Sequence, residues 1–472
     1  MKSAKPCDQD PGLSLQLAQH AVRFDVHSLS ASVVAATERA ILDGIGVMLA
    51  ASGESVEAKA FFELVVSQPG PPQASLLGYN VRASAAQAAL VNGALAHALD
   101  YEDAFDLAPS HPNASLLPAA IATAECHPCS GLEFITAVAL GCDLTCRLGL
   151  SLQRPLEMGG WYPPPILGAF GATLAAGRLA SLDAHALCDA WSLVLAQNSC
   201  PGEIKNSART VLRAVREAFP AHAAVLSVQL AARGIRGFDA PFEGEAAFYA
   251  LFAGGTFDSE AMLGGLGQRF WIEQLSYKRW PCCRGTHAYI EAIQTLRREH
   301  KFNPADIVRI ICAGGPIQQM LCTPHAQKRA PSTVIDAKFS IPFTAALALA
   351  HDEVTLDSFT PIQLANTELL QLAARCEFRL DSQSHPEGAA SGDVTLHLRN
   401  GRVLRHSVAR ALGEPSRPLD NDALLVKFID CACRAANPMT RTDALKFAGR
   451  ILSLAQEPNA ATVFQSLQRL TN

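Results

Sequence analysis

The stretch "RASAAQAALVNGALAHALD", residues 82–100, is built mainly from alanine, with a single glycine near its middle. Alanine is the strongest helix former, and it has no long side chain to keep a neighbouring helix at a distance. The pattern therefore predicts a helix in the tightly packed interior of a helical protein.

The neighbouring segments continue this helical character. In "SVVAATERAILDGIGVMLAAS", residues 32–52, the apolar residues fall on one stripe and most charged residues lie off it. "LGAFGATLAAGRLA", residues 167–180, again combines glycine with alanine. "PAHAAVLSVQLAARG", residues 220–234, opens with proline and closes with glycine, which are helix start and stop signals. Strand signals are scarce in the first 270 or so residues.

The pattern changes in the last third of the chain. "DIVRIICAG", residues 306–314, is short and β-branched, and "DVTLHLRNGRVLRHSV", residues 393–408, carries an Asn-Gly hairpin signal after alternating apolar residues. Helical patterns return near residue 421. We therefore expect a mainly α fold with α+β. A large all-helical domain is expected from residues 1–271 and 416–472, with a smaller α+β lid domain inserted at residues 272–415.

Composition narrows the class of protein further. The chain has 472 residues, of which 49% are hydrophobic and 18% charged, so it can bury a large core. Its net charge of -5 gives no reason to expect nucleic acid or an anionic membrane as a partner. The N-terminal segment has no apolar signal-peptide region, and no apolar stretch reaches the length of a membrane span. We expect a soluble, cytoplasmic protein.

The fourteen cysteines suggest neither a disulfide framework nor a zinc site. Cys126 and Cys129 form a CxxC pair, but no second pair of ligands stands nearby to complete four. The adjacent Cys282 and Cys283 in "WPCCRGTHAYIEA", residues 280–292, leave a redox or zinc protein open as an alternative. We expect no metal.

One polar stretch follows directly from the alanine-rich helix. In "AHALDYEDAFDLAPSHPNASLLPAA", residues 96–120, acidic residues cluster around Asp100 and a histidine, His111, follows in the next loop. Clustered carboxylates repel, which can raise the pKa of one of them and suit it to proton transfer, and histidine titrates near neutral pH. The alternative is a solvated helix end followed by a turn.

Two further stretches bring cations next to apolar helices. "YKRWPCCRGTH", residues 277–287, gathers Lys278 and Arg284 just before a helix that Thr286 opens, which suits an anion site. A basic surface turn with Thr286 as an ordinary N-cap remains the alternative. In "DAKFSIPFTAALAL", residues 336–349, Lys338 taken alone is expected to keep its ammonium in water.

These three stretches, in this order and spacing, resemble the MmgE/PrpD family, and the resemblance covers nearly the whole chain. It implies a helical domain with an α+β lid, a homodimer, and no metal or organic cofactor. It also implies proton movement at a carbon next to a carboxylate in a small di- or tricarboxylate. Dehydration of the 2-methylcitrate dehydratase type is the first expectation, and decarboxylation of the cis-aconitate type or epimerisation are the alternatives.

The resemblance also assigns site residues. It implies Asp100 and His111 as catalytic groups. The substrate-binding residues that it implies are Lys278, Arg284, Thr286, Lys338, Tyr162 and Arg213. Three positions depart from the family pattern: Ala104 replaces a threonine, Tyr162 a histidine and Phe343 a tyrosine. Arg213 corresponds loosely to a lysine of the family. Such exchanges also fit a non-catalytic dimer that binds carboxylates, which is the alternative from another class.

Overall fold

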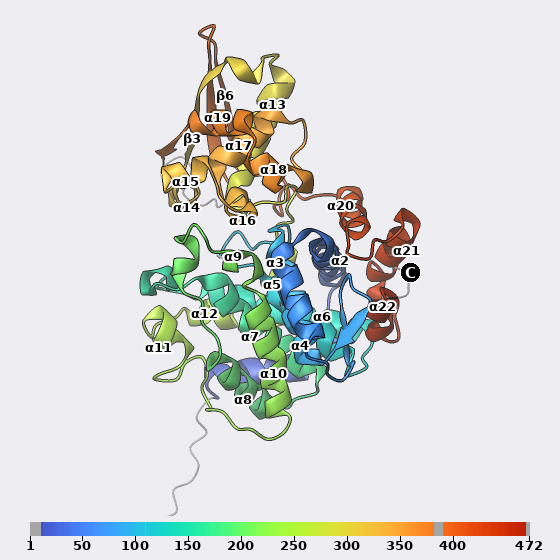
Figure 1. Cartoon of the computed structure of the whole chain (residues 1–472). Helices are drawn as coiled ribbons and strands as arrows, with labels where there is room; N and C mark the ends of the chain where they lie inside the picture. Colours follow the sequence, from blue (N-terminus) through green and yellow to red (C-terminus); the bar gives the residue numbers. More distant parts are fainter. Residues whose placement is uncertain (1–10, 109, 382–389, 469–472) are drawn as a thin grey trace, which may run out of the picture.

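The computed structural model describes residues 11–108, 110–381 and 390–468 (Figure 1). The α-helices of the first part of the chain are α1 Leu13–Arg23, α2 Ala31–Glu54, α3 Val56–Val66, α4 Ala85–Ala98, α5 Pro112–Ala124, α6 Gly131–Leu150, α7 Pro163–Leu179, α8 Ala184–Leu195, α9 Leu212–Val215, α10 Ala218–Ala231, α11 Phe248–Ala253 and α12 Ser259–Leu263. The later α-helices are α13 His287–Glu299, α14 Pro316–Met320, α15 His325–Arg329, α16 Val334–Lys338, α17 Ile341–Ala350, α18 Pro361–Leu364, α19 Thr367–Ala374, α20 Asn421–Cys433, α21 Arg441–Ile451 and α22 Ala460–Ser466.

The strands form a two-stranded hairpin and one four-stranded sheet. The strands are β1 Ala74–Leu76, β2 Val81–Ala83, β3 Ile307–Gly314, β4 Cys376–Leu380, β5 Gly392–Leu398 and β6 Val403–Val408. The larger sheet has the order β4-β3-β5-β6, in which β4 runs parallel to β3 and the other neighbours are antiparallel. The expected Asn-Gly hairpin joins β5 to β6. The fold is therefore mainly α with a small mixed sheet, and the predicted fold class is confirmed.

The two parts of the chain occupy different regions of the molecule (Figure 1). The sheet and α13 to α19 lie at the top of the view, with α13 packed against β5 and β6, and α1 to α12 lie below. The late helix α20 returns to pack against α2 near the N-terminus. The exact boundaries at residues 271 and 416 stay a prediction.

Small residues allow the helices around α4 to approach one another closely. A Cβ atom added at Gly93 of α4 would lie 2.6 Å from the carbonyl oxygen of Glu217 and 2.9 Å from the Cα of Ala218, at the start of α10. Real Cβ atoms do not come so near to backbone atoms, so position 93 has no room for a side chain. The glycine thereby fixes how near α10 lies to the end of α4.

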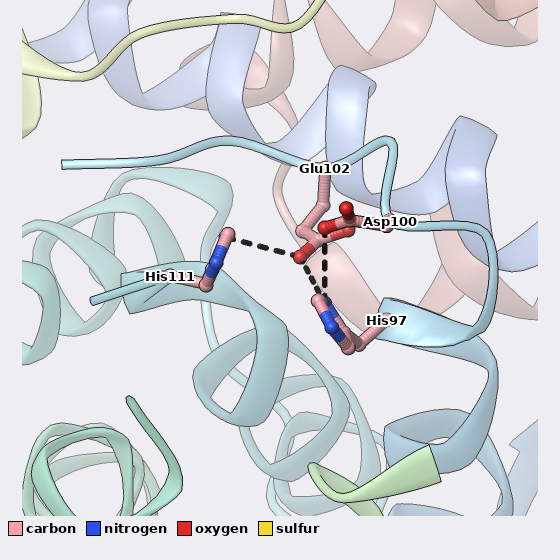
Figure 2. Close-up of side chains that lie close together, drawn as sticks. All are labelled: His97, Asp100, Glu102 and His111. Atoms are coloured by element: carbon pink, nitrogen blue, oxygen red, sulfur yellow. Dashed lines mark hydrogen bonds and ion pairs between the residues drawn. The ribbon is translucent and has the colours of Figure 1, made fainter. Parts of the chain in front are cut away.

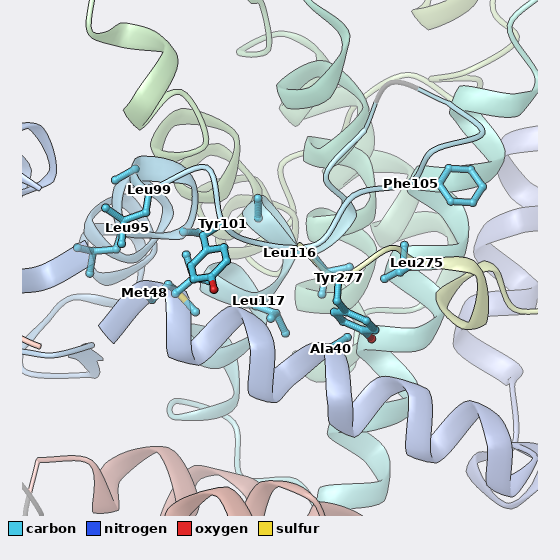
Figure 3. Packing of buried hydrophobic residues seen from close by; sticks show 14 of the residues in the cluster. Ala40, Met48, Leu95, Leu99, Tyr101, Phe105, Leu116, Leu117, Leu275 and Tyr277 are labelled. Carbon is cyan, nitrogen blue, oxygen red and sulfur yellow. The ribbon is translucent and has the colours of Figure 1, made fainter. Parts of the chain in front are cut away.

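An apolar layer supports the loop that follows α4 (Figure 3). Met48 of α2 and Leu117 of α5 lie close to the ring of Tyr101, and Tyr277 lies near them from a segment far along the chain. All four side chains are buried.

Within the described part of the chain, no helix combines the length and the apolar character needed to cross a membrane.

Gly93→Ala should lower the stability of the protein, because the new methyl group meets backbone atoms that cannot move aside. Overpacking of this kind costs about 1–3 kcal/mol. The matched control is Gly449→Ala in the exposed part of α21, where nothing lies within 4 Å of the added Cβ. The control should be neutral or more stable by up to about 1 kcal/mol. Thermal melting of both variants checks this, and equal melting temperatures would contradict the close approach.

Candidate active site

A loop between α4 and α5 holds most of the titratable groups of the candidate site (Figure 2). Asp100 lies just beyond the end of α4 with a backbone φ of 49°, a left-handed conformation that is uncommon for residues other than glycine and that aspartate tolerates better than most. Further along, Ala104 and Ser276 exchange two backbone hydrogen bonds of 2.9 and 2.8 Å. This pairing brings Lys278 to the acidic loop from a distant part of the sequence.

Lys278 and Asp100 form a fully buried ion pair. The ammonium Nζ lies 2.6 Å from Asp100 Oδ1 and donates to the Asp100 carbonyl oxygen at 3.0 Å. Burial disfavours the charged ammonium, but the nearby carboxylates of Asp100 and Glu102 outweigh it and raise the pKa of Lys278. The second carboxylate oxygen of Asp100, Oδ2, is buried and accepts no hydrogen bond from a described residue. It is free to meet a bound molecule.

His97, at the end of α4, is held in one neutral tautomer. Its Nε2 faces the guanidinium Nη1 of Arg216, which can only donate, so Nε2 must carry the lone pair. Its Nδ1 then carries the proton and donates to Glu102 Oε1. Burial and the charge of Arg216 lower the pKa of His97 to about 3, although Glu102 opposes this. His97 is therefore neutral at neutral pH.

Glu102 links the two histidines of the loop. Its Oε1 lies 3.1 Å from His111 Nδ1 and also accepts from His97. Burial alone would raise the pKa of Glu102, but its interactions with His97, the Lys278 ammonium and His111 together bring it well below its usual value. Glu102 is therefore an anion, and its second oxygen, Oε2, is buried without a donor among the described residues.

His111 stands at the start of α5 with its ring held by backbone and carboxylate. Its Nδ1 lies 2.8 Å from the carbonyl oxygen of Asp103, which can only accept, so Nδ1 carries a proton. Nε2 is then the nitrogen that can exchange a proton with a bound molecule. The side chain of His111 is 15% exposed, whereas the side chains of His97, Asp100 and Glu102 are at most 2% exposed. His111 is the member of this group that an incoming molecule can reach first.

Asp103 is the second unusual carboxyl group of the loop. It is fully buried and accepts a hydrogen bond of 2.8 Å from the amide of Asn113. Burial, together with the negative charges of Asp43 and Glu102, raises its pKa to about 7. Asp103 is thus partly protonated at neutral pH, while Glu102 next to it in sequence is ionised.

A group of cations surrounds the ring of Tyr162 beside this cluster. The guanidinium carbons of Arg213 and Arg216 lie 5.5 and 5.1 Å from the ring centroid, and the ammonium of Lys205 lies 5.7 Å away. Arg213 Nη2 also donates to the tyrosine hydroxyl at 3.4 Å. Arg213 Nε is buried and has no acceptor among the described residues. Tyr162 and Arg213, which were expected to bind substrate, therefore lie beside the acid–base cluster. Arg216 contacts both the Tyr162 ring and His97.

In the lid turn at residues 278–287, Arg284 contacts other groups of the protein and does not join the acid–base cluster. Arg284 is occupied by the protein itself: Nε lies 3.1 Å from Asp106 Oδ2, and its terminal nitrogens donate to the carbonyl oxygens of Ala411 and Leu412. Thr286 directly precedes α13, but its hydroxyl donates to the Cys283 carbonyl at 2.8 Å and caps no helix N–H. Substrate binding by Arg284 and Thr286 stays a prediction.

Lys338 does not keep its ammonium in water, so that expectation is wrong. The residue is 1% exposed, and Nζ donates to the Pro281 carbonyl at 2.7 Å while the Lys338 carbonyl accepts from Cys283 N–H at 3.0 Å. Burial lowers the pKa of Lys338 to about 8. The neighbouring thiols do not resemble reactive cysteines, because burial raises the pKa of Cys282 to about 12 and that of Cys283 to about 11.

The potential ligand atoms of the loop lie close enough together to bind a metal ion, but the neighbouring positive charges oppose such binding. One potential ligand atom from each of four side chains lies within 4.8 Å of the others: His97, Asp100, Glu102 and His111. Both nitrogens of His97 already have partners, and the Lys278 ammonium lies 2.6 Å from Asp100. A divalent cation would have to compete with Lys278 and Arg216, so these residues fit an acid–base cluster balanced by protein cations.

The structure brings together three of the predicted residues directly: Asp100, His111 and Lys278. Sequence reasoning counted Glu102 among the clustered carboxylates but assigned no role to Glu102 or His97, and it did not point to Arg216. Adjacent charges at Arg216 and Glu217 inside an otherwise apolar stretch were the available signal, because charged residues are rarely buried without partners.

The fold and the site define a mainly helical protein with a buried carboxylate, histidine and lysine cluster. The MmgE/PrpD N-terminal domain matches residues 15–260, and the MmgE/PrpD C-terminal domain matches residues 280–446. The chain belongs to the MmgE/PrpD family.

Three relatives share 23–24% identity with this chain over most of their length. A cis-aconitate decarboxylase-like protein, oryM, from Aspergillus oryzae is 24% identical, covering 88% of this chain and 89% of its own. The cis-aconitate decarboxylase of Homo sapiens is 23% identical, covering 74% and 73%. The cis-aconitate decarboxylase of Mus musculus is also 23% identical, covering 85% and 83%.

Asp103→Asn should change how stability depends on pH. The pKa of Asp103 is about 7 in the folded protein and 3.8 when unperturbed, so its neutral form contributes stability that is complete below pH 3.8 and is lost as the pH rises through 7. The stability of the uncharged variant does not fall in this way as the pH rises. Relative to the wild type it should gain about 2 kcal/mol between pH 5 and pH 7, at about 1.4 kcal/mol per pH unit.

Melting curves at pH 5, 6, 7 and 8 measure that gain. Asp352→Asn, at a carboxylate whose side chain is 96% exposed, is the control and should follow the wild type. A constant difference between Asp103→Asn and the wild type over this range would mean that Asp103 is ionised throughout.

The paired cysteines should behave as packing residues. A thiol reagent added to the native protein at pH 7 should leave Cys282 and Cys283 unlabelled, because both thiols are protonated and Cys282 is fully buried. Under denaturing, non-reducing conditions all fourteen thiols should react. A count below fourteen, or a bound metal that leaves when both residues are changed to alanine, would favour the redox or zinc alternative.

Proposed function

We propose that this chain is a lyase that acts on a small di- or tricarboxylate by moving a proton at a carbon next to a carboxylate, without a metal or an organic cofactor. The observation that carries the proposal is the buried cluster of Asp100, Glu102, His111 and Lys278, in which two carboxylate oxygens have no donor among the described residues. Buried polar atoms left without partners are costly, so such atoms mark where a bound molecule belongs.

Cations at two sides of the cluster can hold the carboxylates of the substrate. Arg213 offers a buried Nε–H without an acceptor among the described residues, beside the Tyr162 hydroxyl. A hydrogen bond between charged groups is worth about 1.5–3 kcal/mol, and a carboxylate would satisfy this donor. Lys278, on the other side, can stabilise the negative charge that develops when the carbon next to a carboxylate becomes enolate-like.

His111 is the group proposed to carry the proton. Its Nδ1–H is committed to Asp103 and Glu102, which leaves Nε2 to take a proton from carbon or to return one. Glu102 stabilises the imidazolium that forms when His111 accepts a proton. Asp100, neutralised by Lys278, keeps Oδ2 available to bind or hold a proton on the same side.

The depth of the cluster implies a change of conformation during turnover. Asp100, Glu102 and Lys278 are at most 1% exposed, so a substrate can reach them only when part of the surrounding structure moves. Return of that part would exclude water and strengthen every charged contact around the substrate.

Decarboxylation is the first candidate for the overall reaction. Three relatives carry that activity in their names, and this moves the proposal away from the dehydration that the resemblance alone favoured. Loss of carbon dioxide leaves an electron pair on the neighbouring carbon, and the imidazolium form of His111 would protonate that carbon and then take a new proton from water. Dehydration is the second candidate, because the same imidazolium can protonate a leaving hydroxyl group.

A panel of small carboxylates tests the proposal. Saturated and unsaturated di- and tricarboxylates are offered to the protein in deuterated water, and carbon dioxide release, water elimination and deuterium uptake next to the carboxylate are recorded. At least one compound should both raise the melting temperature and turn over or exchange. Compounds that bind without exchange or turnover would favour the non-catalytic, carboxylate-binding alternative.

His111→Ala should lower the turnover number by at least about a hundredfold, since general acid–base catalysis contributes about 10²–10⁴. The fold should persist, because the side chain is partly exposed and stands at a helix start. His127→Ala, which removes an exposed histidine after α5, is the matched control and should leave turnover unchanged. A His111 variant with near-normal turnover would remove that residue from the chemistry.

A further inference from the structure

A row of buried hydrogen bonds runs from Ser115, in the first turn of α5, to His111, and Arg216 stands at its centre. Arg216 is 2% exposed, and its Nε donates to Glu217 Oε1 at 2.9 Å. The other Glu217 oxygen accepts from Ser115 of α5. On the opposite side, Arg216 Nη1 donates to His97 Nε2 and also to the carbonyl oxygen of Arg213 at 3.1 Å.

We propose that Arg216 is a positioning residue that fixes His97 in the tautomer with a proton on Nδ1, and that His97 thereby holds Glu102 in place against His111. The proposal rests on the proposed function only where it concerns turnover. Arg216 acts on His111 through two other side chains, and this role needs no contact between Arg216 and the substrate, although its Nη2 is buried without an acceptor among the described residues.

The direction of the hydrogen bonds requires this arrangement. A guanidinium has five donors and no acceptor, so a ring nitrogen that forms a hydrogen bond with it must accept through a lone pair. His97 has only one other nitrogen, which must then donate to Glu102. If His97 took the opposite tautomer, its Nε2–H would meet the Arg216 donor and its Nδ1 lone pair would meet an anionic oxygen. Both contacts would be repulsive.

Charges from every side of His97 decide its protonation. Arg216 opposes the imidazolium, whereas the carboxylates of Glu102 and Asp100 favour it, with Asp100 Oδ1 3.9 Å from His97 Nδ1. The ring of His111 lies 5.2 Å away, and Lys278 lies 3.9 Å from Glu102. Without the guanidinium, only burial would oppose the two carboxylates, so the pKa of His97 would rise and its cationic form would neutralise Glu102. Glu102 would then support a charged His111 less well.

Nitrogen-15 spectra of the histidine rings in the full-length protein test the proposal. A His97→Gln variant identifies the His97 signals among those of the fourteen histidines. In the wild type, His97 should carry its proton on Nδ1 and remain neutral from pH 5 to pH 8. A wild-type His97 with its proton on Nε2, or one that titrates in this range, would overturn the proposal without any variant.

Two substitutions extend the test. Arg216→Met keeps an unbranched side chain without the charge, and His97 should then titrate between pH 5 and pH 8. Arg216→Lys keeps a cation and should restore the neutral state at least in part. Arg213→Met, which removes the neighbouring cation that makes no hydrogen bond to His97, is the control and should leave the His97 tautomer unchanged. A His97 that stays neutral in Arg216→Met would overturn the proposal.

The kinetic readout separates this proposal from the proposed function. Once a turned-over carboxylate is known, Arg216→Met should lower the turnover number at least about tenfold and shift its pH profile, and Arg216→Lys should recover part of the loss. An unshifted pH profile would contradict the link to His111. If no carboxylate is turned over, the proposed function fails, while the spectra still decide the role of Arg216.

Discussion

The ion pair between Lys278 and Asp100 is the contact on which the rest of the site depends. Both side chains are at most 1% exposed, and removing one partner from such a buried pair costs about 3–5 kcal/mol because a charge is left alone. The pair forms only if Asp100 takes its left-handed backbone conformation and if the segment of Ser276 lies along the acidic loop. The path of the chain from α4 to α5 and the seating of the sheet region are therefore linked through one contact.

A second buried ion pair, between Lys427 and Asp43, lies next to the first and stabilises it. Lys427 of α20 lies 2.6 Å from Asp43 of α2, and its ammonium also donates to the carbonyl oxygens of Tyr101 and Lys278. One C-terminal lysine thus holds the backbone on both sides of the Lys278–Asp100 pair. This explains in physical terms why a helix from the end of the chain packs against one from its beginning. Without α20, the carbonyl groups of Tyr101 and Lys278 would lack this donor and the carboxylate of Asp43 would lack the neighbouring positive charge.

The elements that follow a regular pattern could be predicted from the sequence, whereas buried charges could not. The stripes and small residues of α2, α4 and α10 identified those helices, and the Asn-Gly pair identified the hairpin of β5 and β6. The short β4, whose pairing with β3 is parallel and distant in sequence, gave no such signal. For the candidate site, clustering pointed to Asp100 and His111. Arg216 and Lys338 could not be placed, because a single sequence does not distinguish a charge in water from one enclosed by partners.

The three departures from the family pattern fall outside the hydrogen bonds that define the acid–base cluster. Ala104 contributes its backbone to the pairing with Ser276, which needs no side chain, and Phe343 is fully buried near the start of α17. Tyr162 differs, because its ring and hydroxyl face Arg213 and Arg216 at the edge of the cluster. A tyrosine there is longer than a histidine and carries its polar atom farther from the backbone. Under the proposed function, the exchange would alter which carboxylate fits beside Arg213, whereas His111, the group proposed to carry the proton, is unchanged. It favours a difference in substrate over a loss of catalysis.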